Sequence, residues 1–423
     1  MNIAVHDVAA DTGSLIRQAS SVCGDYLEKL KAEYATIPEV SPFIEIIRKA
    51  YEPEMIASTK PKVILFGTDF PQEILHALTG QCAVTILGGS RIYIDASDDS
   101  VPRDTDPVTR SMLGQLYVAE PYWRASALVV VPCSSDAQRK AAYLLSERGW
   151  NVVTVWIPSV KDEDSRKAYR SEIDHAVGTI CRHIGKRWSS ASLHKSAVLY
   201  ESVRTSVREF LAVVLHHEDI LPGPLRMAVM DSFFLTDNIV QWQKDLNLLT
   251  VALSREEQNV NTCPRVLLIG SPIYVPNAKI PFLLHDSGIG ICGCIDSRDA
   301  QTESMLELSK RISLKSLENH YFNSDSSPAF VNNEQLTKTI CAYIQSTKPD
   351  GIIWHVLKGQ IEYDFELNRA EKIFEEYDLP VIRLETDYQY QDIEQLRIRI
   401  EAFAELLRQK KLEKGASCEE NRR

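Results

Sequence analysis

The stretch PKVILFGTDFP, residues 61–71, decides the fold because its pattern recurs as PRVLLIGSPIYVP at residues 264–276. Each copy contains a proline, a basic residue, four apolar residues, a glycine and a hydroxyl residue, in that order. A short apolar run that ends in glycine is typical of a buried parallel strand entering a tight turn. A helix-like pattern follows both copies, in QEILHALTG and in KIPFLLHDSG. The two stretches therefore predict two related strand–turn–helix units.

Two further pairs of segments extend the repeat. ALVVVPCSSD at residues 127–136 corresponds to GIIWHVLKGQ at residues 351–360, and NVVTVWIPS at residues 151–159 corresponds to LPVIRLETD at residues 379–387. Strands that alternate with amphipathic helices at this spacing favour βαβ units. The predicted fold class is α/β, with two similar Rossmann-like parallel-sheet halves, a helical N-terminal lead-in, a helical insert and a long C-terminal helix.

The length of the chain, 423 residues, favours more than one core. We predict a helical lead-in at residues 1–59 and a first α/β domain at residues 60–160. A helical segment at residues 161–255 separates this domain from a second α/β domain with the C-terminal helix at residues 256–423. Long amphipathic patterns, such as SLHKSAVLYESVRTSVREFLAVV, are the basis for the helical segment.

Composition narrows the class of protein. A net charge of −11 argues against nucleic acid as a partner, because a phosphate-backbone binder needs a basic face. No apolar run reaches the ~18–20 residues that would span a bilayer, so no membrane association is expected. The beginning, MNIAVHDVAADTG, carries acids where a secretory signal has basic and then apolar residues. We therefore expect a cytoplasmic protein whose nine cysteines are reduced thiols or ligands.

Ligands of open parallel sheets bind outside the carboxyl ends of the strands, so the crevice between the two halves is the predicted pocket. The turns GTDFPQE, PCSSD, GSPIYVP and LKGQIEYDFE belong to this edge. Glu73 lies near the start of the helix after the first strand. It either stabilises that helix through its dipole or acts as a general base or substrate-orienting carboxylate, and both readings stay open. Thr68 and Ser271, at the ends of the paired strands, are candidate hydrogen-bond donors to a substrate.

Other motifs favour neither nucleotide nor zinc chemistry. GSPIYVPNAK lacks the second glycine and the GK[ST] ending of a phosphate-binding loop, and GIGICGC lacks the third glycine of a dinucleotide motif. Cys292 and Cys294 are closer in sequence than usual metal ligands, and simple core packing is the alternative. The run His216, His217, Glu218 lacks the i, i+4 spacing of a zinc helix, so a polar helix end is expected.

Six stretches of the chain together carry a family resemblance. In order, they are KVILFGTDFPQEILHALTG, VPRDTDPVTRSMLGQL, VVVPCSSDAQRK, RVLLIGSPIYVPNAKIPFLLHDSG, LKGQIEYDFELNRAEKIFEEYDLPVIRLETDY and DIEQLRIRIEAFAELL. With them the chain resembles the 2-hydroxyacyl-CoA dehydratase family, which also includes the substrate-binding subunits of ATP-dependent benzoyl-CoA reductase. The resemblance covers about residues 45–408, and LPVIRLETDYQYQDIEQLRIRIEAFAE is its most specific part.

The resemblance implies a multi-component enzyme acting on an acyl-CoA. In this family two related subunits pair, and catalytic subunits hold a [4Fe–4S] cluster on cysteines near the substrate. A separate iron–sulfur ATPase activator supplies an electron that allows an unactivated hydroxyl to leave as water, or an aromatic ring to be reduced. The implied partners are therefore the activator, an acyl-CoA, and either a homologous cysteine-bearing sister subunit or a second copy of this chain.

The resemblance places the cluster cysteines in three turns, and this chain departs from it in each of them. In the turn VPRDTDP, Asp106 occupies the position expected for the first cluster cysteine. Ser135 stands where a second cysteine usually precedes an aspartate. Gly359 and Gln360 occupy the turn after HVLK. Ser135 and Gln360 are then expected to contact substrate instead of iron.

Cys133 is the remaining candidate metal ligand at the predicted edge, two positions before Ser135. One thiolate cannot hold a [4Fe–4S] cluster. A metal site at Cys133 therefore requires Asp106 and thiols such as Cys292 or Cys294 to converge on it, and a buried or turn thiol is the alternative.

Two classes of function follow. In the first, the chain is a subunit of a 2-hydroxyacyl-CoA dehydratase or benzoyl-CoA reductase-type system, with Glu73 as the proton-transfer residue and Thr68 and Ser135 facing the substrate. In the second, it is a cluster-free paralogue that acts as a scaffold, regulatory or small-molecule-binding protein, since a fold by itself does not confer a function.

Overall fold

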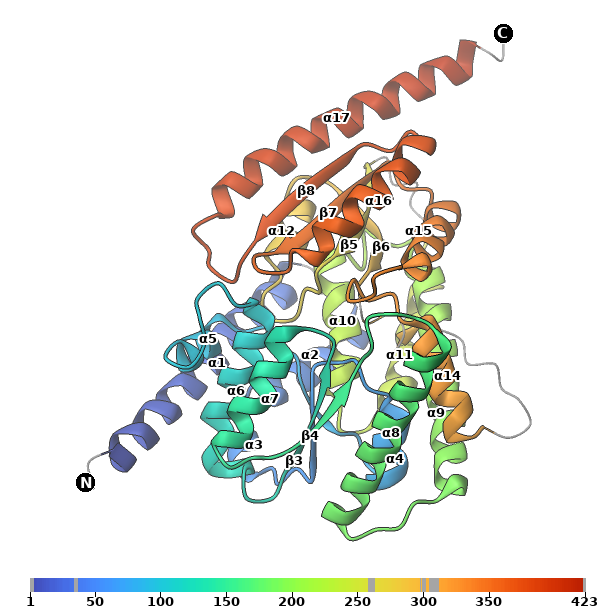
Figure 1. Ribbon diagram of the computed structural model, residues 1–423. Helices are drawn as coiled ribbons and strands as arrows, with labels where there is room; N and C mark the ends of the chain where they lie inside the picture. Colours follow the sequence, from blue (N-terminus) through green and yellow to red (C-terminus); the bar gives the residue numbers. More distant parts are fainter. Residues whose placement is uncertain are drawn as a thin grey trace.

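The structure is a computed structural model that describes residues 4–33, 37–257, 263–296, 298, 302–303 and 312–420. These residues contain two four-stranded parallel sheets with the strand orders β2-β1-β3-β4 and β6-β5-β7-β8. Figure 1 shows the second sheet stacked above the first, with long helices running beside both. The predicted fold class of two similar α/β halves is confirmed. We call the parts built on the two sheets the first and second halves.

The strands of the first half are β1 (Val63–Phe66), β2 (Val84–Ile86), β3 (Leu128–Cys133) and β4 (Asn151–Trp156). Those of the second half are β5 (Arg265–Gly270), β6 (Gly290–Ile295), β7 (Gly351–Leu357) and β8 (Val381–Thr386). Every residue of β1, β3 and β7 is buried, as expected for central strands covered by helices on both faces. The three predicted strand pairs thus hold equivalent places in the two sheets, and β2 and β6 add an edge strand to each.

Helices cover both faces of both sheets. The lead-in consists of α1 (Ala4–Glu33), η1 (Pro38–Val40), α2 (Ser41–Ala50) and α3 (Pro53–Ser58). The first half adds α4 (Gln72–Thr79), α5 (Arg91–Ser97), α6 (Pro107–Trp123) and α7 (Asp136–Glu147). The insert consists of α8 (Glu163–Ile184), α9 (Ser190–Val214), α10 (Gly223–Leu235) and α11 (Ile239–Leu253). The second half adds α12 (Lys279–Asp286), α14 (Leu314–Ser324), α15 (Glu334–Thr347), α16 (Glu362–Glu376) and α17 (Ile393–Glu420).

Local signals set the ends of several helices. The Asp162 carboxylate accepts a hydrogen bond of 2.7 Å from the amide of Ser165 and begins α8, while Gly185 ends α8 with a φ of 68°. None of the described helices has the length and apolar composition needed to cross a membrane.

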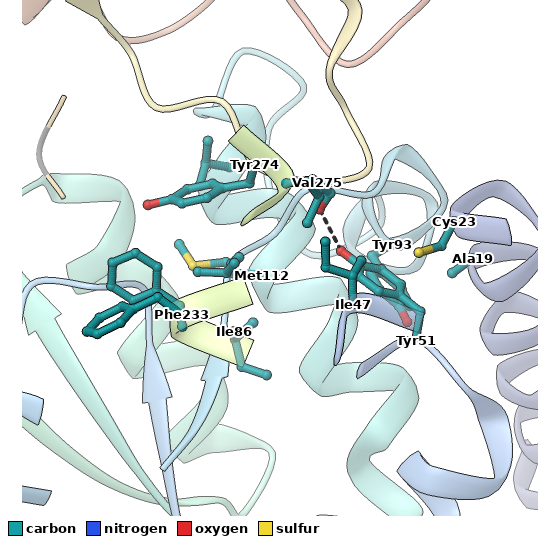
Figure 2. Packing of buried hydrophobic residues seen from close by; sticks show 14 of the residues in the cluster. Ala19, Cys23, Ile47, Tyr51, Ile86, Tyr93, Met112, Phe233, Tyr274 and Val275 are labelled. Carbon is teal, nitrogen blue, oxygen red and sulfur yellow. Dashed lines mark hydrogen bonds between the residues drawn. The ribbon is translucent and has the colours of Figure 1, made fainter. Parts of the chain in front are cut away.

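The hydrophobic cores extend across the predicted domain boundaries. Tyr274 and Val275 of the second half belong to the same buried cluster as the lead-in and the first sheet, and Figure 2 shows this packing. The Tyr51 hydroxyl donates a hydrogen bond of 2.9 Å to the carbonyl of Val275. Leu317 and Phe322 of α14, which follows β6 in the chain, pack in a buried cluster with Val63 and Leu65 of β1. The boundaries themselves stay predictions, but the two halves share buried surface.

Gly270, at the end of β5, shows how closely the central strands approach each other. Its φ is 128°, and a Cβ built there would lie 2.0 Å from the carbonyl oxygen of His355 in β7. A side chain at this position would therefore be strained and would also push β5 away from β7.

We expect Gly270→Ala to lower the free energy of unfolding by about 3 kcal/mol or more, from backbone strain and the clash together. Urea unfolding followed by circular dichroism measures the loss. Gly149→Ala is the matched control, because Gly149 also has a positive φ, 82°, but open space around it. Its cost should be about 1 kcal/mol, and equal losses for the two variants would contradict the close approach.

Candidate functional site

A cavity of about 860 Å³ lies between the two halves, at the crevice that the repeat predicts. Its walls come from the turns after the central strands β1, β3, β5 and β7, and from the start of α6. Of the residues predicted to face a substrate, Thr68, Ser135 and Gln360 line it. A cavity of this size, built by both sheets, is typical of a small-molecule or cofactor site.

Thr68 and Asp69 form the wall after β1. The chain turns at Gly67, whose φ is 83°, and brings both side chains to the cavity. The Thr68 hydroxyl donates a hydrogen bond of 3.3 Å to Asp69 Oδ1. Although Asp69 keeps some exposure through the cavity, burial, together with the nearby Asp325, raises the pKa of its carboxyl to about 7. Asp69 can therefore exchange a proton near neutral pH.

Ser135 lies at the amino end of α7. Its hydroxyl accepts a hydrogen bond of 3.3 Å from the amide of Gln138, and Gln138 Oε1 accepts bonds of 3.1 Å and 2.9 Å from the amides of Ser135 and Ser134. This capping box fixes the turn after β3. Ser135 therefore reaches the cavity as part of a rigid helix start.

Asp106 joins the two halves across the cavity. As the cap of α6 it accepts hydrogen bonds from the amides of Val108 and Thr109, at 3.1 Å and 3.0 Å, and from the Thr109 hydroxyl at 2.6 Å. From the second half, Gln360 Nε2 donates a bond of 2.8 Å to Asp106 Oδ1. Burial raises the pKa of Asp106, and these hydrogen bonds oppose the rise.

Glu73 does not line the cavity. It is fully buried and forms an ion pair with the equally buried Arg204 of α9, while the Tyr321 hydroxyl donates a bond of 2.8 Å to Glu73 Oε2. These contacts tie α4 to α9 and α14. Of the two open readings of Glu73, a structural role has direct geometric support, and proton transfer stays a prediction.

Ser271 and Cys133 also lie outside the cavity lining. The Ser271 hydroxyl accepts a hydrogen bond of 2.9 Å from the amide of Leu357, and so connects β5 to β7. The Cys133 thiol is fully buried and lies 3.4 Å from the carbonyl of Val131. Burial raises its pKa to about 11, which disfavours the thiolate that binds metal.

Metal ligands do not converge in the part of the chain that the structure describes. No group of three or more His, Cys, Asp or Glu side chains there could hold a metal ion. Cys292 and Cys294 lie on β6, where they line a different cavity from the one at Asp106. The metal site that the sequence allowed at Cys133 has no geometric support in these residues and stays a prediction.

Two residues of the site were not singled out in the sequence. Asp69 lies four positions before Glu73 and only two after Gly67, and this closeness to the end of β1 was a usable signal. Tyr274 lines the cavity from the turn after β5, and its ring stacks 5.2 Å from the Arg298 guanidinium. Because Arg298 comes from the segment after β6, no local pattern could have indicated this contact.

Comparison with known proteins gives a consistent picture. The family described as 2-hydroxyglutaryl-CoA dehydratase, D-component, matches residues 67–407. The Putative dehydratase subunit YjiM of Escherichia coli (strain K12) is 24% identical over 352 residues, or 82% of this chain and 91% of that protein. The (R)-phenyllactyl-CoA dehydratase beta subunit of Clostridium sporogenes is 22% identical over 256 residues, or 60% of this chain and 68% of that protein.

The structural reading of Glu73 predicts that Glu73→Gln lowers the free energy of unfolding by about 3 kcal/mol, because it leaves a buried guanidinium poorly compensated. The exposed pair of Glu394 and Arg397, 3.5 Å apart, supplies the control. Glu394→Gln should cost less than about 1 kcal/mol. Urea unfolding of both variants makes the comparison, and equal losses would contradict the structural role of Glu73.

Asp69→Asn should reveal the raised pKa through the pH dependence of stability. The unfolded chain releases the Asp69 proton near its ordinary pKa, whereas the folded chain holds it up to about pH 7. The wild type therefore loses stability as the pH rises from about 4 to 7. We expect the asparagine variant to gain about 2 kcal/mol over the wild type across this window, and no more above it. Urea unfolding at pH 4, 6 and 8 measures this, with the exposed Asp99→Asn as control, and a pH-independent difference would contradict it.

Proposed function

The chain belongs to the family of the 2-hydroxyglutaryl-CoA dehydratase D-component, and from this we propose that it binds an acyl-CoA in the cavity between its halves as one subunit of a 2-hydroxyacyl-CoA dehydratase-type system. The observation that carries the proposal is the position of the cavity. The cavity lies at the carboxyl ends of the strands of both sheets. Asp106, Ser135 and Gln360 line it, and they belong to the three turns where the resemblance expects functional side chains.

Several features of the cavity suit a CoA thioester. Its volume of about 860 Å³ accommodates an acyl group and part of the pantetheine arm. Arg110, Arg139 and Lys140 lie along its lining, and Lys140 is exposed. Arg110 is paired with Asp98 and Arg139 with Asp136, so the exposed Lys140 is the lining cation proposed to meet a phosphate of CoA.

We further propose that this chain carries no iron–sulfur cluster of its own. The cavity offers an aspartate, a serine and a glutamine where thiolates would be needed, and thiolate is the usual cluster ligand. Two of these side chains also bind each other, since Gln360 donates to Asp106. At position 359, a φ of 87° and a Cβ only 2.8 Å from the carbonyl of Asp104 disfavour any side chain. The residues present do not fit the cluster, so electron transfer is assigned to a cysteine-bearing sister subunit and its ATPase activator.

Within such a complex, this chain would bind and orient the substrate and exchange a proton. Loss of water from a 2-hydroxyacyl-CoA removes a hydroxyl group and a proton from adjacent carbons. Asp69, with a pKa near 7, can protonate the departing hydroxyl or take up the released proton. Thr68 and the buried Tyr274 lie beside it and can orient polar groups of the substrate.

Direct binding to acyl-CoA tests the proposal. Isothermal titration with 2-hydroxyglutaryl-CoA, phenyllactyl-CoA and benzoyl-CoA should show saturable binding of at least one of them to the wild-type chain. Ala137→Trp places a bulky ring on the cavity wall and should weaken binding by about tenfold or more. Ala125→Trp, at an exposed position outside the cavity, is the matched control. Absence of binding to all three ligands would sink the acyl-CoA proposal and favour a cluster-free paralogue with another ligand.

Iron and acid-labile sulfide, measured after anaerobic purification and reconstitution, test the proposal that the chain carries no cluster of its own. We expect the content of each to stay well below that of one [4Fe–4S] cluster per chain. Stoichiometric iron and sulfide in the wild-type chain would overturn the cluster-free assignment while leaving acyl-CoA binding intact. If the chain is cluster-free, dehydration activity is expected only when a cysteine-bearing sister subunit and the activator are added.

A further inference from the structure

A second cavity, of about 580 Å³, lies apart from the first, and no described residue lines both. It is enclosed by α9, α10, β6 and α15. One part of its wall is apolar and consists of Leu211, Leu215, Met227, Met230 and Phe234. Flexible methionines beside an aromatic ring form a surface that adapts to aliphatic ligands.

Three arginines line the polar part of this cavity, and two of them are engaged within the protein. Arg298 pairs with Asp231 and with Asp296, and its Nε donates a bond of 2.9 Å to Asp296 Oδ1. Arg208 donates bonds of 3.1 Å to the carbonyl of Glu303 and 3.0 Å to the hydroxyl of Thr205.

Arg226, the third arginine, is different. It is 95% buried, and its Nη2 has no hydrogen-bond partner among the described residues. Glu218 lies near enough for its pKa to be lowered by Arg226, but no hydrogen bond joins the two in the described structure, and burial raises the pKa of Glu218 overall. A buried guanidinium nitrogen without a partner carries a desolvation cost that a bound anion would relieve.

No acidic group of the lining accepts a hydrogen bond from Arg226 Nη2 among the described residues. Asp296 is held by Arg298, and Glu303 accepts a hydrogen bond from the Tyr343 hydroxyl. Burial raises the pKa of the Glu303 carboxyl, and the nearby Arg226 and Arg298 oppose the rise. The cavity thus combines an apolar wall with a buried guanidinium nitrogen that has no hydrogen-bond partner among the described residues.

We propose that this second cavity binds an aliphatic monocarboxylate, with its carboxylate on Arg226 and its chain against the apolar wall. A guanidinium fork matches a carboxylate in geometry and charge. A CoA thioester fits poorly, because its carbonyl is uncharged and cannot pair with the buried guanidinium as a carboxylate does. The ligand is therefore a free acid, and the inference stands independently of the acyl-CoA proposal for the first cavity.

Calorimetric titration of the full chain with octanoate tests this site, and octanamide serves as the uncharged ligand of equal length. We expect one octanoate per chain and binding of octanamide weaker by about tenfold or more, the usual value of a charge-assisted hydrogen bond. Arg226→Met should lower the octanoate affinity by about the same factor and abolish the preference for octanoate over octanamide. Arg255→Met, at an exposed position outside the cavity, is the matched control.

Failure of octanoate to bind the wild type would overturn the proposal. Binding that Arg226→Met leaves unchanged would do the same, because that binding would belong to another site. If Arg226→Met does not fold, Ala342→Trp decides the matter. Ala342 is exposed on α15 and lines the cavity, so the added ring should block octanoate without disturbing the core. Full octanoate affinity in a folded Ala342→Trp variant would overturn the proposal.

Discussion

The turn at Tyr274 and Val275 is the contact on which the rest of this structure depends. It carries the second half onto the first, and both backbone polar groups of Val275 find buried partners there. The carbonyl accepts from the Tyr51 hydroxyl at 2.9 Å, and the amide donates to Asp231 at 2.8 Å. Gly89 permits the approach, since a Cβ at that position would lie 1.9 Å from the Val275 carbonyl oxygen. Losing either partner would leave a buried backbone group unsatisfied, so the two halves are held in one relative position.

Because the two halves are held in one relative position, one side chain from each half can meet in the cavity. Asp106 and Gln360 meet across it at 2.8 Å although 254 positions separate them in the chain. At this position, where the resemblance expects cluster cysteines, the chain has an amide and a carboxyl group bound to each other. Asp69 lies on the same cavity wall as Thr68, and burial raises its pKa to about 7.

The sequence was sufficient to predict most of the fold and part of the site. The internal repeat identified the three strand pairs and their functional edge, because burial on both faces leaves a local apolar signature. The strand β2 was missed, since three residues give too short a pattern. Glu73 was singled out because it lies near a helix start, and Asp69, four positions earlier, was not. The distinction depends on Arg204 and Tyr321, which are distant in sequence and close only in the folded chain. Long-range pairing of this kind leaves no trace in local spacing.

The composite wall of the first cavity also has a consequence for the energetics of folding. Its lining begins at Gly67 and ends at Tyr363, so the site does not exist until the two sheets have docked. A ligand that binds there binds only the docked state, and by mass action it stabilises docking by RT ln(1 + [L]/Kd). The amount of ligand present therefore sets how firmly the two halves are held together. A chain starved of ligand should separate its halves more often than one that is saturated.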